Sequence, residues 1–443
     1  MFENILHQEK VVNQLKTDII SGTLAPSILF SGPEYSGKGT TALELARALC
    51  CEEESRQCRW NCNCPSCIRH RNLFSPDMLL LGKRCFFVEI AASSGAFLRN
   101  PENSGTKILF FRSVRKLLAR FNDILWEDDP KLGKLKTQII ILEDELEEVE
   151  SSGKEGSRLA KKCESISKKA AKLETVGLGE LISIAQIRRA AYWSHLVPLG
   201  RQKCVIIENA ENMLEGAKNS LLKILEEPPE SLTLILTSSR PNSLLPTVLS
   251  RLREYRFIKR SPEAETDVLN RIFRESSGKK QSLESYFTSF LPVKNETLYA
   301  LGAYLFSSVA AKVIRELHGR GNKIPDLLAD FGKFSALIAE AGGVGRSEVN
   351  SKDALGKILD MAEHFEIPGL FTKFLQQCTG LVSAWLQAGM PVSGANYDGI
   401  EKIILADRWM KKLNRSRTEN DSYNISPPMV LERLFEELKK GII

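Results

Sequence analysis

A glycine-rich turn between an apolar stretch and a helix-forming stretch is the feature that most constrains the fold. The turn runs from Gly32 to Lys38, after the apolar residues 28–30 and before the helical stretch 40–49. Glycines there let backbone N–H groups approach a phosphate, and the lysine reaches its outer oxygens. The pattern therefore predicts a phosphate-binding loop that joins a strand to a helix. The candidate nucleotide contacts are Gly32, Gly37, Lys38, Thr40 and, from a later strand, Glu208.

Two positions depart from what a hydrolysing site needs. Such loops place a Ser or Thr hydroxyl on Mg²⁺ directly after the lysine, but Gly39 stands here and Thr40 comes one residue too late. The apolar strand at 204–207 leads to Glu208 and Asn209, and an asparagine cannot act as a general base. We expect no ATP hydrolysis; weak nucleotide binding and a purely structural turn both remain open.

A second series of sequence features, a helix, a strand and a loop in that order, ends in an arginine. An apolar-periodic helix around 219–227 is stopped by two prolines, a β-rich run follows at 232–237, and a loop then leads to Arg251. This layout is suited to offering an arginine to the phosphate of a neighbouring subunit. The alternative is an ordinary helix stop followed by a surface arginine.

These strings resemble the clamp-loader family of bacterial DNA polymerase III, which includes the delta-prime subunit and the gamma/tau ATPase and belongs to the AAA+ class. The resemblance rests on the opening residues 2–8, the turn at 32–38, the helix with Glu226-Glu227-Pro228-Pro229, and Ser250-Arg251-Leu252 in place of Ser-Arg-Cys. It implies that Arg251 is an arginine finger acting in trans on a neighbour's ATP, worth on the order of 10³ or more in rate.

The resemblance also implies the architecture. We expect an α/β fold, with an AAA+ P-loop core built on a parallel sheet, a helical insertion, a helical lid and a C-terminal all-α collar. The expected domains are 1–257 for the core, 258–322 for the lid and 323–443 for the collar that holds an oligomer together. The insertion is expected at about 91–180.

Six of the ten cysteines lie between Cys50 and Cys67. In a large chain without a secretory signal, metal binding is expected rather than disulfide formation. Structural zinc needs four tetrahedral ligands, and unliganded thiols are the alternative. The first choice of ligands is Cys51, Cys62, Cys64 and Cys67, with Cys58 or His70 as a substitute. The spacing of Cys62 and Cys64, with one intervening residue, is shorter than in the related subunits.

The insertion carries opposite charges on two helical stretches. Residues 143–148 are acidic, residues 158–172 are basic, and a Ser/Gly turn lies between them. We expect an antiparallel hairpin that projects from the core, as a solvated spacer rather than a nucleic-acid arm. Elsewhere the pattern predicts an amphipathic helix over 2–24, a polar loop over 415–422 and a terminal helix around 431–438.

Net charge and the distribution of apolar residues constrain the partners and the location expected for the protein. The formal net charge is +6, a mild basic bias that permits contact with DNA without requiring it. The sequence has no run of 18 apolar residues and no basic, apolar leader at its start. We expect a soluble cytoplasmic protein.

The resemblance implies a function. We expect a non-hydrolysing stator of the clamp loader, which loads the sliding clamp onto primed DNA in chromosomal replication. Its partners would be the gamma/tau and delta subunits in a heteropentamer. It would be a noncatalytic subunit of a DNA polymerase holoenzyme, without ATPase activity of its own. The alternatives are a gamma/tau-type ATPase and a zinc-containing nucleic-acid adaptor.

Overall fold

The computed structural model forms two compact units, Met1–Phe290 and Leu291–Ile443. The structure describes residues 1–53, 58–151, 156–179, 181–275, 281–291, 293–319, 325–342, 356, 370–388, 399–423 and 425–440.

The first unit is built on a five-stranded sheet in the order β2-β3-β4-β1-β5, and every pair is parallel. The strands are β1 (Ser27–Ser31), β2 (Met78–Leu81), β3 (Lys203–Ile207), β4 (Leu232–Ser238) and β5 (Arg253–Arg256). The first four are buried along their whole length, as expected for a parallel sheet covered on both faces. The predicted α/β fold class is confirmed.

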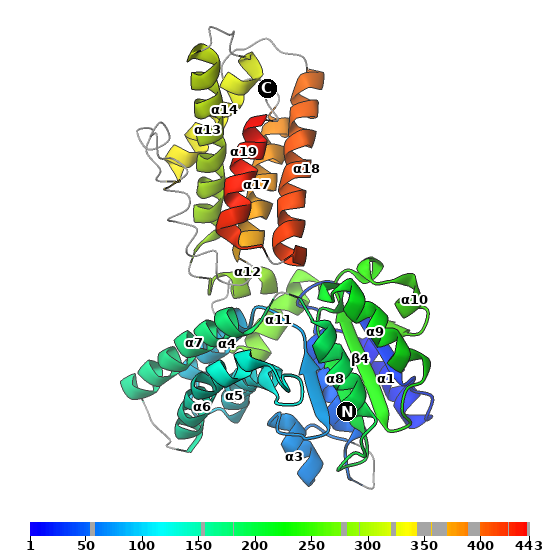
Figure 1. The fold of residues 1–443 in the computed structure, drawn as a ribbon. Helices are drawn as coiled ribbons and strands as arrows, with labels where there is room; N and C mark the ends of the chain where they lie inside the picture. Colours follow the sequence, from blue (N-terminus) through cyan, green and yellow to red (C-terminus); the bar gives the residue numbers. More distant parts are fainter. Residues whose placement is uncertain are drawn as a thin grey trace. The chain divides into compact units, whose positions relative to one another are not determined.

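Alternate side chains of the strands pack into different layers. Ile28 and Phe30 of β1 join a cluster with α1 (Glu9–Ile20) and α2 (Lys38–Leu49). Leu29, between them, joins the cluster on the opposite face. That face is covered by helices that include α8 (Ile184–Ser194) and α9 (Glu215–Glu226), which lie beside β4 in Figure 1.

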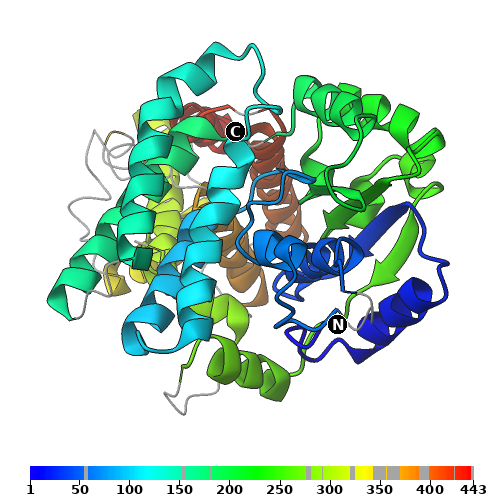
Figure 2. The same cartoon turned by 90° about the horizontal axis from the view of Figure 1, so that it is seen from below.

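Four helices separate β2 from the segment that leads to α8. They are α4 (Phe86–Arg99), α5 (Ser104–Leu118), α6 (Pro130–Ser151) and α7 (Ser157–Gly177), with the short turn η1 (Ala119–Phe121) after α5. Figures 1 and 2 show these helices gathered beside the sheet.

The predicted antiparallel pairing of α6 and α7 is confirmed, but the hairpin does not project from the core. Glu145 pairs with Lys169 at 2.7 Å and Glu148 with Lys162 at 2.6 Å, so the two helices run in opposite directions. Their apolar faces belong to the same buried cluster as α4, α5 and the sheet. The apolar stripe at Leu142 and Leu146 needs a partner surface, and the core supplies it. The connecting residues 152–155 lie outside the described part.

The remaining helices of this unit are short. They are α3 (Pro65–Arg71), α10 (Pro246–Leu249), α11 (Pro262–Ile272) and α12 (Leu283–Thr288), with the turns η2 (Ala210–Asn212) and η3 (Pro241–Ser243). Val268, Leu269 and Phe273 pack against Ala92 and Ala96 of α4. The start of the predicted lid therefore packs with the first unit.

The second unit is helical. Its helices are α13 (Asn295–Gly319), α14 (Asp326–Ala341), α17 (Leu370–Gln387), α18 (Gly399–Tyr423) and α19 (Pro427–Lys440). Phe331 lies at its centre, with ring centroids 4.7 Å from Trp385 and 4.5 Å from Trp409. The segment Glu296–Gly319 of α13 has the length and apolar composition of a membrane span, but 72% of its apolar window is buried, as in a core helix.

Two predicted segments differ from the structure. The helix predicted over 2–24 spans only Glu9–Ile20, and Ile20 is 78% exposed. The polar loop predicted over 415–422 is wrong, because those residues continue α18, where Arg415 pairs with Glu419 one turn later at 3.0 Å. The compact units divide at 290/291. The domain boundary at 257 stays a prediction, and the one at 322 lies outside the described residues.

Candidate functional site

The turn after β1 requires its two outer glycines. Gly32 has φ of 139°, and a Cβ there would lie 2.5 Å from the carbonyl oxygen of Phe257. Gly37 has φ of 98° and stands at the N-cap of α2. Backbone in this region favours glycine, which has no Cβ to clash. The turn therefore carries the chain from β1 to the N-terminus of α2, the place where phosphates bind in folds of this kind.

Lys38 is folded back onto the loop. Its Nζ donates to the carbonyl oxygens of Gly32 at 2.7 Å and Pro33 at 2.6 Å, and the residue is 8% exposed. Burial lowers the pKa of Lys38 to about 8, partly offset by the nearby carboxylates, with Glu211 first. The lysine is at the expected place, held by the loop's own oxygens.

The space beside position 39 is filled by Glu208. A Cβ at Gly39 would lie 2.4 Å from Oε1 of Glu208 and 3.3 Å from Nη1 of Arg84. The side-chain position that a serine or threonine would use to hold Mg²⁺ is thus taken by a carboxylate. Thr40 lies in the first turn of α2 and is half-buried.

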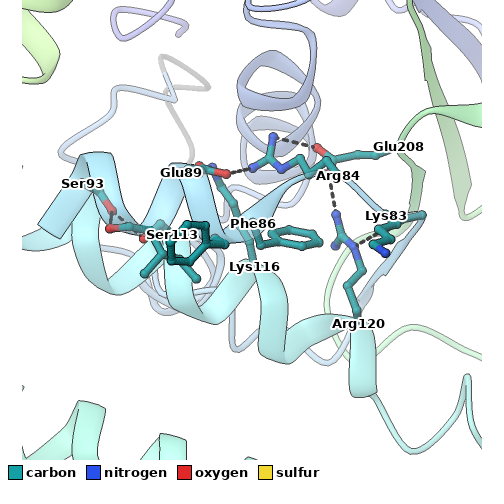
Figure 3. Close-up of polar contacts among 12 residues, drawn as sticks. Lys83, Arg84, Phe86, Glu89, Ser93, Ser113, Lys116, Arg120 and Glu208 are labelled. Atoms are coloured by element: carbon teal, nitrogen blue, oxygen red, sulfur yellow. Dashed lines mark hydrogen bonds and ion pairs between the residues drawn. The ribbon is translucent and has the colours of Figure 1, made fainter. Parts of the chain in front are cut away.

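Glu208 belongs to a largely buried cluster of five charged residues (Figure 3). Arg120 Nη2 donates to Glu208 Oε2, and Arg84 Nη1 lies 3.5 Å from Oε1. Arg84 also donates to Glu89, whose other oxygen lies 2.5 Å from Nζ of Lys116. Burial acts to raise the pKa of Glu208, but Arg84 and Arg120 outweigh it and hold that pKa below its usual range. Glu208 is therefore ionised and already paired.

Asn209 has a structural role. Its backbone is left-handed, with φ of 52°, a conformation that asparagine tolerates better than most residues. Its Nδ2 donates to the carbonyl oxygen of Lys83 at 2.8 Å. The amide thus ties the end of β3 to the segment after β2.

These residues do not fit a magnesium ion. A P-loop site uses a hydroxyl after the lysine and carboxylates at the end of the neighbouring strand. Here Gly39 supplies no hydroxyl, and Glu208 is held by two guanidinium groups. Asn209 faces the Lys83 carbonyl.

The four cysteines of first choice lie together. The Sγ atoms of Cys51, Cys62, Cys64 and Cys67 all lie within 4.8 Å of one another, and those of Cys51 and Cys62 are 3.8 Å apart. Cys64 caps α3, and its sulfur accepts from the N–H groups of Glu52 at 3.5 Å and Cys67 at 3.4 Å. Four sulfurs at this separation fit a tetrahedral zinc site.

The two substitute ligands have other contacts. The Cys58 thiol donates to the carbonyl oxygen of Ala48 at 3.4 Å. Nδ1 of His70 lies 2.9 Å from the carbonyl oxygen of Ser66. Neither belongs to the group of four.

Arg251 lies at the surface, directly after α10 and its cap Ser250. Its side chain is 35% exposed, and Nη2 donates to Oε1 of Glu226 at 2.8 Å. Nη1 donates to the carbonyl oxygen of Thr247 at 2.8 Å. Glu226 is the last residue of α9. The ion pair therefore joins the end of this helix to the arginine that follows α10.

The sequence analysis missed the cations of the charged cluster. Arg84 follows β2, at the carboxyl edge of a parallel sheet where ligands bind, and this position was a usable signal. Lys116 and Arg120 lie at the end of α5 and in η1, within an amphipathic stretch, and no local pattern marked them.

A parallel sheet covered by helices, with a glycine-rich turn between its first strand and a helix, defines an α/β protein. A family model described as DNA polymerase III, delta subunit, matches residues 7–261, more than half of the chain. The chain belongs to this family, one of the DNA polymerase III clamp-loader families.

Curated relatives match over shorter segments. The chain is 51% identical over 53 residues to the delta-prime subunit of Pseudomonas aeruginosa, covering 12% of this chain and 16% of the relative. It is 40% identical over 68 residues to the delta-prime subunit of Bacillus subtilis, which covers 15% of this chain and 21% of that relative. It is 31% identical over 100 residues to the gamma/tau subunit of Mycobacterium tuberculosis, which covers 23% of this chain and 17% of that relative. The chain thus spans about a fifth of these relatives' lengths or less.

A solved structure, of a DNA polymerase III gamma subunit-related protein from Thermotoga maritima, aligns over 97% of this chain and all of its own length. The TM-score is 0.35 and the identity 16%.

Proposed function

We propose that the chain is a non-hydrolysing subunit of the clamp loader, of the delta-prime type, that takes part in loading the sliding clamp onto primed DNA. The observation that carries this proposal is the charged cluster at the magnesium position. Glu208 is paired with Arg84 and Arg120, and it fills the space beside Gly39. A site without a place for the metal cannot polarise the attacking water or the leaving phosphate.

The proposed contribution of this subunit is Arg251 acting in trans. The side chain is partly exposed, and its pair with Glu226 is a surface ion pair, typically worth about 0–1 kcal/mol. Such a pair is readily exchanged for the γ-phosphate of an ATP bound to a neighbouring subunit. The planar guanidinium fork also loses less side-chain entropy per hydrogen bond that it forms.

The partners follow from this role. We propose gamma/tau and delta subunits in a heteropentamer, the sliding clamp, and primed DNA contacted through the complex, all in the cytoplasm. Support comes from the family and from relatives named as delta-prime and gamma/tau subunits. We further propose that zinc bound by the four cysteines has a structural role, because no fifth group among the described residues is placed as a base or open ligand position.

ATP hydrolysis tests this function. The chain alone, and the complex reconstituted with the other loader subunits, clamp and primed DNA, are compared as wild type, Arg251→Ala and Arg271→Ala. Arg271 is a matched control, because it is exposed and also faces a carboxylate, that of Asp267 at 3.5 Å. We expect a silent isolated chain and an active complex that only Arg251→Ala disables, by on the order of 10³. Turnover by the isolated chain would contradict the proposal and indicate a motor subunit.

A further inference from the structure

The charged cluster beside the phosphate loop carries more positive than negative groups. Arg84 comes from the segment after β2, Lys116 from α5 and Arg120 from η1. Arg112 of α5 faces Lys116 from the same helix. The carboxylates that face these cations are Glu89 of α4, Glu174 of α7, Glu208 and Glu44 of α2, and Glu44 is itself paired with Arg47 at 2.6 Å. With Arg47 included, five cations against four carboxylates leave one positive charge in a largely buried place.

Two donors of this cluster have no hydrogen-bond partner within the described part of the chain. They are Nη1 of Arg120, in a residue that is 3% exposed, and Nε of Arg84. A buried N–H left without an acceptor costs about 1–3 kcal/mol, and more for a charged group. Excess charge and unsatisfied guanidinium donors together indicate an anion as the missing component.

The cluster lies against the phosphate loop. Nη1 of Arg84 is 3.3 Å from the Cβ position of residue 39, the residue that follows Lys38. The side chain of Arg84 is 27% exposed, so a ligand can reach it, and its planar fork matches the geometry of phosphate oxygens. Glu208 would repel a phosphate if it were free, but Arg84 and Arg120 neutralise it. In a magnesium-dependent site, that neutralisation is the work of the metal.

We propose that the loop at 32–38 and the guanidinium groups of Arg84 and Arg120 bind the phosphate chain of a nucleotide or polyphosphate without a divalent cation. Arginines from the segments around the insertion replace the metal. Lys38 leaves the carbonyl oxygens of Gly32 and Pro33 to contact the ligand. This goes beyond the proposed function, because the subunit would hold a phosphate ligand that it cannot hydrolyse.

Isothermal titration of the full chain tests the proposal, with ADP, ATP and pyrophosphate as probes. Each is titrated with magnesium and in buffer freed of magnesium by a chelating resin, since dissolved EDTA would also compete for zinc at the cysteines. We expect a Kd that changes less than about threefold between the two conditions, which is below 1 kcal/mol. A loss of about tenfold or more without magnesium, or no heat with any probe, would overturn it. Tighter binding of ADP than of pyrophosphate would identify a nucleotide, and equal binding a polyphosphate group; both rankings support the proposal.

Variants locate the bound anion. Arg84→Gln should weaken magnesium-free binding by about tenfold or more, the scale of a lost charge-assisted hydrogen bond. Arg99→Gln is the control, because Arg99 is 37% exposed and pairs with Glu275 near α11. Thermal melting of both variants verifies that they fold, and Arg84→Lys serves if Arg84→Gln does not. Unchanged affinity in a folded Arg84 variant would refute the role of the cluster. Because this assay uses the isolated chain, its failure leaves the Arg251 test untouched.

Discussion

Single residues decide what the phosphate loop can do. Gly39 removes the hydroxyl that a metal site needs, and its missing side chain leaves room for the Glu208 carboxylate. Asn209 accepts a left-handed backbone and bonds to Lys83 instead of serving as a base. The sequence predicted the loss of metal chemistry from these two positions. It gave no sign that an ion-paired carboxylate fills the vacated space.

Gly32 and Gly22 both have positive φ but differ in the space available for a side chain. Gly32→Ala should destabilise the protein by about 1–3 kcal/mol or more, because its Cβ would meet the Phe257 carbonyl oxygen at 2.5 Å. Gly22 also has positive φ, of 70°, but nothing lies within 4 Å of its Cβ position. Gly22→Ala should therefore cost only the backbone term, about 1 kcal/mol. Urea unfolding of both variants measures the difference, and equal losses would contradict the close approach.

Because burial lowers the pKa of Lys38, we expect the stability of the protein to depend on pH. The pKa of Lys38 is about 8 in the folded chain against 10.5 for an unperturbed lysine, so the unfolded chain binds more protons between these values. The free energy of unfolding should rise with pH across this window, by at most on the order of 3 kcal/mol from Lys38. Lys116 has a similarly lowered pKa, so the wild type is compared with Lys38→Met, which should show a smaller rise. Parallel pH profiles would contradict the lowered pKa of Lys38.

At the scale of elements, the cysteine module joins the end of α2 to α3. Cys51 follows α2, whereas Cys64 and Cys67 lie at the start of α3. Arg47 of α2 donates to Sγ of Cys67 at 2.9 Å, which holds the two elements together from inside. The spacing of the cysteines was irregular, yet the fold brings the four sulfurs together.

Zinc content tests the module. We expect about one zinc per chain by elemental analysis, lost in Cys67→Ser, since tetrahedral zinc needs all four thiolates. Cys58→Ser should retain the metal, because the Cys58 thiol contacts the Ala48 carbonyl oxygen rather than the four sulfurs. Loss of zinc in Cys58→Ser with retention in Cys67→Ser would assign the ligands differently.

For the helices of the insertion, local sequence predicted how they pair, and tertiary contacts decided where the pair packs. The charges of α6 and α7 predicted their pairing correctly, because these contacts join neighbouring segments. Whether the pair stands in solvent or packs on the core depends on the surface that α4 and α5 present. Residues 415–422 looked like a loop because they lack apolar periodicity, but the ion pair of Arg415 with Glu419, one turn later, supports a polar helix.

At the scale of the whole molecule, we propose that Arg251 acts on a neighbouring subunit, and Glu226 would then compete with that subunit for the arginine. In the reconstituted complex, Glu226→Gln should leave ATPase activity equal or up to about fivefold higher, because a surface pair worth about 0–1 kcal/mol no longer has to be broken. Glu227, exposed and adjacent, provides the control variant Glu227→Gln. A large loss in Glu226→Gln alone would mean that the glutamate positions the arginine for the reaction.

The resemblance to the clamp-loader family implied the parallel α/β core. The sequence by itself determined the glycine-rich turn, the order of the features from Glu226 to Arg251 and the grouping of the cysteines. These features depend on periodicity, turn chemistry and spacing, which act over short stretches of chain. Only the tertiary structure decided that Glu208 meets Arg120, 88 positions away, and that Arg84 lies beside Gly39. Charged side chains pair wherever packing brings them together, so their partners are set by the assembled core and not by local sequence.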